Sequence, residues 1–190
     1  HPGETVAILV RGRTQLPTLL HKLRNEGIPY QAVDIDRLTD LPEIIDALAL
    51  ARALSHEGDR VAWLALLRSP WVGLDWNDLN RLVANRPKHT VLELLRDERR
   101  IAKLSGHGQH AVRHFEATMG EVFEPDRSSP LSVRVERAWF ALGGPGLLAD
   151  ENAVENVNAF FEVLATMETG GLLPDVAAVM AELDAERVST

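Results

Sequence analysis

The sequence begins like an α/β domain and then contains no further strand signal. Thr5–Val10 is a continuous apolar run rich in β-branched residues, which is typical of a strand buried on both faces. A helix is predicted from Thr14 to about Glu26, ended by Gly27, with a second short strand over Gln31–Ile35. Two parallel strands cannot form a stable sheet alone. The remaining strands are therefore expected outside this chain, unless the βαβ unit packs on the helices.

All later signals are helical. Asp40 and Glu43 have capping-box spacing and predict a helix to about Ser55. Thr90 and Glu93 have the same spacing and predict a helix to about Leu104. Further helices are predicted over about 59–67, 76–85, 106–122, 130–142, 150–168 and 174–188, begun by caps such as Asp59, Asp75, Ser129 and Asp150. The predicted fold is mainly α, with a small N-terminal βαβ piece over residues 1–40 and about eight helices over residues 41–190.

Composition limits the class of protein. Among 190 residues, 20 are Lys or Arg and 28 are Asp or Glu, which gives a formal net charge of −8. There is no cysteine, so a disulfide scaffold, a thiolate zinc site and a cysteine nucleophile are excluded. This composition fits a reducing cytoplasm. No apolar run approaches the ~18 residues of a membrane span, and we expect no membrane partner.

The net charge is uneven along the chain. Residues 61–120 carry 9 basic and 6 acidic side chains, net +3, whereas residues 121–190 carry 4 and 13, net −9. A local basic surface can bind DNA phosphates even on an acidic protein, because salt screens charges beyond ~8–10 Å. Acidic Glu93, Asp97 and Glu98 interrupt the stretch, so a solvated helix face is the alternative. The candidate DNA-binding residues are Arg81, Arg86, Lys88, Arg96, Arg99, Arg100 and Lys103.

Three other patterns have simpler explanations. His107, His110 and His114 share one helix face, but exposed helical histidines are common and we predict no metal site. Residues 143–146, Gly-Gly-Pro-Gly, are predicted to form a helix–helix turn, because they lack the Lys-Ser/Thr of a phosphate-binding loop. The tryptophans at positions 63, 71, 76 and 139 are expected mostly in the core, although single-stranded nucleic acid could stack on an exposed one.

Arg11 directly follows the predicted strand Thr5–Val10. Ligands of α/β sheets bind at the carboxyl ends of strands, and an arginine there can reach a phosphate with its guanidinium fork. The alternative is an arginine that simply extends into solvent. The residues alone show no complete active site.

Several segments together resemble the UvrD/Rep family of superfamily 1 DNA helicases. Val6–Gln15, Gly27–Tyr30 and Leu41–Leu48 resemble the start of the family's second RecA-like domain. Leu66–Leu74 and Val135–Pro145 are most similar to the helicase–nuclease branch, which includes RecB/AddA-like proteins and the exodeoxyribonuclease V beta-subunit. The aromatic stretch that the family carries after its second strand is replaced here by residues 34–40, so an aromatic contact is in doubt there.

The resemblance implies a fold and a function. In this family a mostly helical insertion, the 2B subdomain, interrupts the second RecA-like domain, and residues 41–190 are similar to it. The Walker motifs lie upstream, so the chain is expected to be an inactive fragment of an ATP-dependent DNA helicase or helicase–exonuclease that acts in DNA repair or recombination. Arg11 matches the family arginine that contacts the ATP γ-phosphate, which would make it both catalytic and cofactor-binding.

The same resemblance implies cofactors and partners. ATP and Mg²⁺ are expected in the full-length protein and none in the fragment. The expected partners are single-stranded and duplex DNA, the remaining helicase domains of the same chain, and, as a further candidate, a second exonuclease subunit. The alternative is a stand-alone helical protein-interaction module without catalytic activity. A small α/β hydrolase is disfavoured, because its catalytic motifs are absent.

Overall fold

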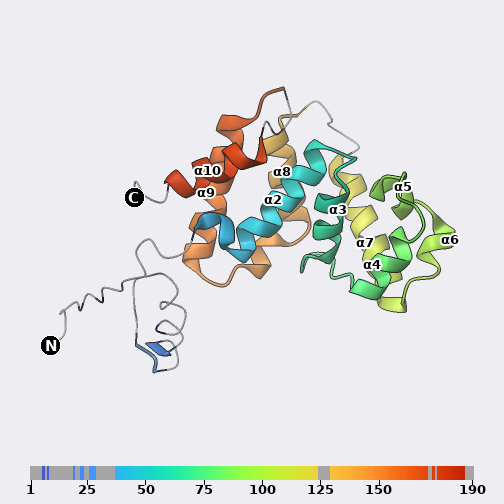
Figure 1. The fold of residues 1–190 in the computed structure, drawn as a ribbon, viewed down its shortest axis with the longest axis horizontal. Helices are drawn as coiled ribbons and strands as arrows, with labels where there is room; N and C mark the ends of the chain where they lie inside the picture. Colours follow the sequence, from blue (N-terminus) through green and yellow to red (C-terminus); the bar gives the residue numbers. More distant parts are fainter. Residues whose placement is uncertain are drawn as a thin grey trace. The chain divides into compact units, whose positions relative to one another are not determined.

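The computed structural model describes residues 37–123, 129–170, 173 and 175–186, together with Val6, Ile8, Leu19, Lys22, Leu23 and residues 26–28. The chain divides into two compact units, residues 1–37 and residues 38–190 (Figure 1). Each unit is described by itself.

Most of the predicted βαβ piece lies outside the described residues, so its two strands stay predictions. Leu19, Lys22 and Leu23 have helical backbone conformation. Gly27 follows them with φ +65°, and the Ile28 N–H donates to the Leu23 carbonyl at 3.0 Å. A glycine in the left-handed region with this hydrogen bond is a common helix end, as the sequence predicts at Gly27.

The second unit is built around α2 (Pro42–Ser55), which lies beside α3 (Arg60–Arg68), α8 (Leu131–Ala141) and α9 (Glu151–Met167) (Figure 1). Ile44, Ala47 and Leu50 of α2 are completely buried. The 3₁₀ turn η2 (Leu38–Asp40) precedes α2, and α10 (Val176–Glu186) packs against both η2 and α9. Alanines recur along α2, so the neighbouring helices can approach its backbone closely.

A group of shorter helices lies beyond α3. It consists of α4 (Trp76–Val83), α5 (Val91–Leu95), α6 (Glu98–Ile101) and the longer α7 (Gly106–Phe123) (Figure 1). The group is continuous with the core, because α7 packs on α8 and Trp63 of α3 meets Phe115 of α7 edge to face, with ring centroids 6.5 Å apart. A second 3₁₀ turn, η3 (Gly144–Leu147), connects α8 to α9. None of the described helices is long and apolar enough to cross a membrane.

Most predicted helix starts are confirmed. The carboxylates of Asp59, Asp75 and Asp150 each accept a hydrogen bond from the backbone N–H three residues later, which caps α3, α4 and α9. Both hydrogen bonds of the predicted capping box between Thr90 and Glu93 are present at α5.

Three predicted boundaries are wrong. Asp40 does not cap α2: it belongs to η2, and the N-cap is Leu41, without a side-chain hydrogen bond. The helix predicted from Thr90 to Leu104 is split into α5 and α6, because the Asp97 carboxylate accepts the Arg99 N–H and starts a new helix. At α8 the N-cap is Pro130, so the predicted Ser129 cap is one residue too early.

Candidate nucleic-acid interface

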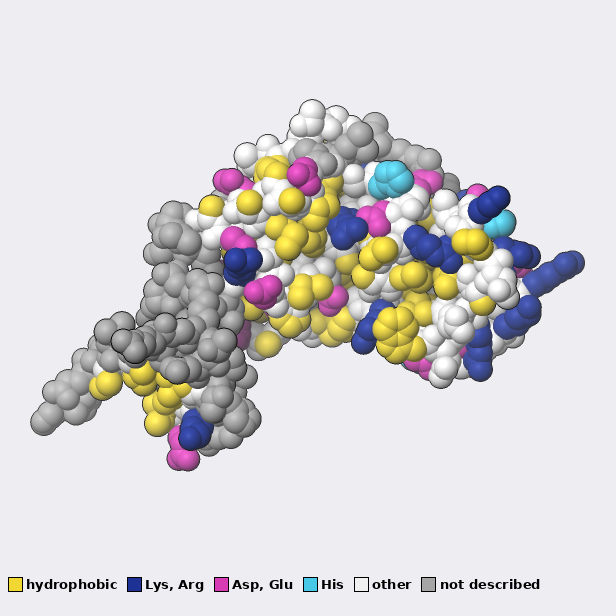
Figure 2. All heavy atoms as spheres, viewed as in Figure 1, with side chains coloured by type: hydrophobic (Ala, Val, Ile, Leu, Met, Phe, Trp, Pro, Cys, Tyr) yellow, Lys and Arg dark blue, Asp and Glu magenta, His cyan; other side chains and the backbone are white. Residues whose placement is uncertain are grey.

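The predicted basic residues lie on α4 and α6, at the C-cap of α5, and in the segments that join α4 to α5 and α6 to α7. Figure 2 shows Lys and Arg side chains gathered over this end of the molecule. Glu98 of α6 faces Arg113 of α7 at 3.9 Å, so acidic groups are interspersed with the basic ones. Six of the seven candidates are exposed: Arg81, Arg86, Lys88, Arg96, Arg99 and Lys103.

The guanidinium of the seventh candidate, Arg100, is hydrogen-bonded within the protein. It donates to the backbone carbonyls of Leu82 at 2.7 Å and Ala84 at 3.0 Å, and also to that of Arg81 at 3.2 Å. Those carbonyls belong to the last turn of α4 and to its C-cap, Ala84, where a positive charge is favourable. Arg100 therefore caps α4 from a distance along the chain, and the remaining six cations are better placed to meet a ligand.

Arg60 is a further arginine that the sequence did not single out, and its guanidinium is occupied by backbone carbonyls like that of Arg100. It donates to the carbonyl of Val83, the last residue of α4, at 3.2 Å, and to those of His89 at 3.0 Å and Arg86 at 3.3 Å on the segment that joins α4 to α5. Arg60 is also the first residue of α3, where a positive charge opposes the helix dipole. An arginine at this unfavourable position is the sequence feature that could have indicated hydrogen-bond partners outside α3.

A buried carboxylate fixes the geometry of this region. Asp78 of α4 is only 1% exposed and accepts hydrogen bonds from the Ser105 backbone N–H at 2.8 Å and from the Ser105 hydroxyl. Arg81 lies 3.3 Å from the same carboxylate. Burial by itself raises the pKa of Asp78, but the Ser105 hydrogen bonds and the Arg81 charge outweigh it and hold the pKa below its ordinary value. Asp78 thus ties α4 to the start of α7.

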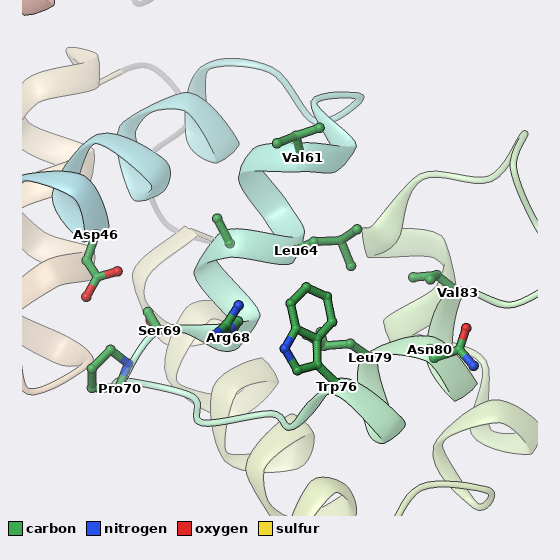
Figure 3. A pocket seen from close by; sticks show the side chains of 11 residues that line it. Asp46, Val61, Leu64, Arg68, Ser69, Pro70, Trp76, Leu79, Asn80 and Val83 are labelled. Atoms are coloured by element: carbon green, nitrogen blue, oxygen red, sulfur yellow. The ribbon is translucent and has the colours of Figure 1, made fainter. Parts of the chain in front are cut away.

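A groove runs between α3 and α4 beside the basic surface. It encloses about 620 Å³ and is lined mainly by apolar side chains, with Trp76 in its middle (Figure 3). The Arg68 guanidinium lies over the Trp76 ring, 4.7 Å from the ring centroid, which is a cation–π contact. Asp46 lines the far end of the groove, and burial raises the pKa of its carboxyl group.

The tryptophans have different environments. Trp63 and Trp139 are buried, as predicted, and Trp71 is half-buried against the core. Trp76 is 68% exposed, so the prediction of a core position is wrong for it. The reason is tertiary: Trp76 is the first residue of α4 and lines the open groove, whereas Leu79 and Leu82, further along the helix, are buried.

The other candidates are placed as follows. His107, His110 and His114 are all exposed on α7, and no group of three or more His, Asp or Glu in the described part of the chain could hold a metal ion. Residues 143–146 form the turn between α8 and α9, as predicted. Gly144 lies against the Trp139 ring, with no room for a side chain. Arg11 lies outside the described residues, so its role stays a prediction.

Comparison with known proteins relates this chain to DNA helicases. The family described as UvrD-like helicase C-terminal domain matches residues 1–103. The chain is 25% identical over 178 residues to the ATP-dependent DNA helicase Rep of Salmonella typhimurium, which covers 89% of the chain and 26% of that relative. It is 29% identical over 91 residues to an ATP-dependent helicase/nuclease subunit of Bacillus velezensis, which covers 48% of the chain and 7% of that relative. The protein of the same name in Geobacillus kaustophilus is 31% identical over 90 residues, 47% of the chain and 7% of that relative. The chain thus spans about a quarter, or less, of the length of these relatives.

Proposed function

This chain belongs to the UvrD-like helicase C-terminal domain family, and from that premise we propose that it works within an ATP-dependent DNA helicase. The relatives are named as an ATP-dependent DNA helicase and as ATP-dependent helicase/nuclease subunits. In the proposed protein, ATP hydrolysis with Mg²⁺ drives movement along single-stranded DNA and separation of the duplex during repair or recombination. Exonuclease activity is a second candidate, which the similarity to the helicase/nuclease subunits favours.

Within that protein, the described helices are proposed to contact DNA. The single observation that supports this is the exposed basic surface on α4, α6 and the adjoining loops, formed by Arg81, Arg86, Lys88, Arg96, Arg99 and Lys103. Cations on a rigid helical scaffold bind the DNA backbone by neutralising phosphates and releasing counterions, without reading the sequence. The proposed contact is therefore weak, insensitive to sequence and strongly dependent on salt.

The ATP-dependent step is assigned to the other unit of the chain. Arg11, by the resemblance of its segment, is proposed to contact the γ-phosphate of ATP that is bound by helicase domains outside this sequence. A positive charge at that point stabilises the charge that develops on the transferred phosphoryl group. Arg11 would then link DNA movement to hydrolysis.

The proposal is tested by removing charge from the basic surface. Arg96, Arg99 and Lys103 are changed together to Gln in the 190-residue chain, while Arg100 is kept because it caps α4. Binding of a DNA hairpin is measured over a range of salt concentrations. The slope of log K against log salt should fall in magnitude by ~0.9 for each phosphate of duplex DNA that the variant no longer neutralises.

A matched control makes the same change in net charge elsewhere. Asn152, Asn158 and Ala165 are exposed on α9, and changing all three to Glu also lowers the net charge by three. That variant should keep most of the affinity and the original slope. If both triple variants lose affinity equally, the surface has no specific role. If neither does, the alternative of a helical protein-interaction module is favoured.

A further inference from the structure

We propose that the groove between α3 and α4 binds a nucleotide of single-stranded DNA, with its base stacked on Trp76. This inference deepens the proposed function, on which it rests, and assigns to the chain a site separate from the basic surface. The groove has the size of ordinary ligand sites, at about 620 Å³.

The first observation is the position of Trp76. Its indole stands in the middle of the groove, with Arg68 on one side and with Asn80 and Val83 on the other (Figure 3). The side chain is 68% exposed, although burying a tryptophan is among the largest gains that folding can make. An aromatic ring held in an open groove is the usual surface on which proteins stack single-stranded bases.

The second observation is the state of Arg68. Its guanidinium covers one face of the Trp76 ring, and no carboxylate among the described residues pairs with it. The stacking fixes both side chains, so neither has to be ordered when a ligand arrives. The opposite face of the indole is left for a base, and the Arg68 charge is left for the adjoining phosphate.

The third observation is the charge around the groove. Arg60 lies at the Val83 end, where it donates to the Val83 carbonyl, and Arg68 lies in the middle. The lining carboxylate is Asp46, at the opposite end, and Asp75, before Trp76, is exposed and caps α4 through the Asp78 N–H. Asp59, beside Arg60, is paired with Arg52, and Asp78 with Arg81. Arg81 of the basic surface directly follows Asn80, which lines the groove, so a strand that follows that surface can place one base in the groove.

The chemistry of the groove favours a single strand over a duplex. In a duplex the faces of the bases are stacked on each other and are not available, whereas an unpaired base can leave the stack. The Asn80 side chain lines the groove and has no hydrogen-bond partner among the described residues. It can donate to and accept from the edge of a base, and so adds a polar contact to the apolar walls.

The test uses two single strands of equal length, one of oligothymidine and one of abasic sugar-phosphate units. Binding to the 190-residue chain is followed by strand anisotropy at low salt, and tryptophan fluorescence is recorded alongside. Oligothymidine should bind more tightly than the abasic strand and quench the emission. Trp76→Ala should weaken oligothymidine binding by about 5- to 150-fold, the equivalent of one stacked base, and leave the abasic strand unaffected.

Two further variants complete the test. Trp76→Phe should retain most of the affinity for oligothymidine, because the phenyl ring still offers a face for stacking. Phe140→Ala removes an aromatic ring that is 56% exposed on α8, outside the groove, and should have no effect on either strand.

The results separate this inference from the proposed function. Equal binding of oligothymidine by Trp76→Ala and the unaltered chain overturns the stacking site, and so does an equal loss for both strands. If the Arg96, Arg99 and Lys103 variant still weakens DNA binding in either case, only the stacking site fails. If the unaltered chain binds neither strand nor the hairpin, both proposals fail. Binding of an apolar helical peptide in the groove, without binding of oligothymidine, would assign the groove to a protein partner and overturn the inference.

Discussion

Removing the carboxylate of Asp78 should destabilise the helical unit strongly. The side chain accepts two hydrogen bonds from Ser105 and one from Arg81, and it is almost completely buried. A hydrogen bond to a charged group contributes about 1.5–3 kcal/mol, and the bonds at one carboxylate are not additive. Asp78→Ala should therefore lower the free energy of unfolding by about 3 kcal/mol, out of the roughly 5–15 kcal/mol typical of a domain.

The measurement is urea unfolding at neutral pH, with Asp75→Ala as the matched control. Asp75 caps the same helix but makes one capping bond, to the Asp78 N–H at 2.8 Å. Losing a single N-cap bond costs about 1 kcal/mol. A variant of Asp78 that is no less stable than the Asp75 variant would refute the view that this carboxylate holds α4 to α7.

The pH dependence gives a second readout. The pKa of Asp78 is lowered in the folded state, so its contribution to stability is complete above the ordinary pKa of about 3.9 and is lost as pH falls through the folded-state pKa. The stability difference between the unaltered chain and Asp78→Ala should shrink as pH falls below about 4. A difference that stays constant across that range would show that the lost interactions do not depend on the charge.

Three further outcomes are expected. Arg100→Ala should lower the free energy of unfolding by about 2 kcal/mol in urea unfolding, because three carbonyls of α4 lose their donor, whereas Arg99→Ala, on an exposed side chain, should stay within about 0.5 kcal/mol. Gly144→Ala forces a Cβ into the Trp139 ring and should cost about 1–3 kcal/mol in the same assay, whereas Gly146→Ala meets nothing within 4 Å and should cost little. In a complete helicase that carries this segment, Arg11→Ala should lower DNA-stimulated ATP turnover by ~10²-fold and weaken nucleotide binding less; unchanged turnover would remove Arg11 from the mechanism.

The features predicted correctly from the sequence are mostly local. Capping by Asp59, Asp75 and Asp150 depends on a side chain and a backbone N–H three residues apart, so the sequence contains all the information. The break between α5 and α6 is also local, but the competing hydrogen bond of Asp97 was overlooked beside the stronger signal of the Thr90 capping box.

The candidate interface depends on contacts between distant residues. Arg100 looked like the neighbouring arginines in sequence, and only the fold brings it to the carbonyls of Leu82 and Ala84. Trp76 resembled the core tryptophans, but it stands at the start of α4, where it lines an open groove. Such outcomes are set by tertiary packing, which hydrophobic patterning alone does not specify.

The position of α2 also affects how the chain can fold during synthesis. Its partners arrive late: Asn156 of α9 donates to Glu43 at 3.0 Å, and the Thr39 hydroxyl before α2 donates to Asp184 of α10 at 3.1 Å. Translation proceeds at about 5–20 residues per second, so the roughly 100 residues between the end of α2 and the start of α9 take about 5–20 s. Throughout that interval the apolar surface of α2 that α9 finally covers stays open on the ribosome. A synonymous codon change that slows translation between residues 56 and 150 would extend that exposure without altering the finished protein.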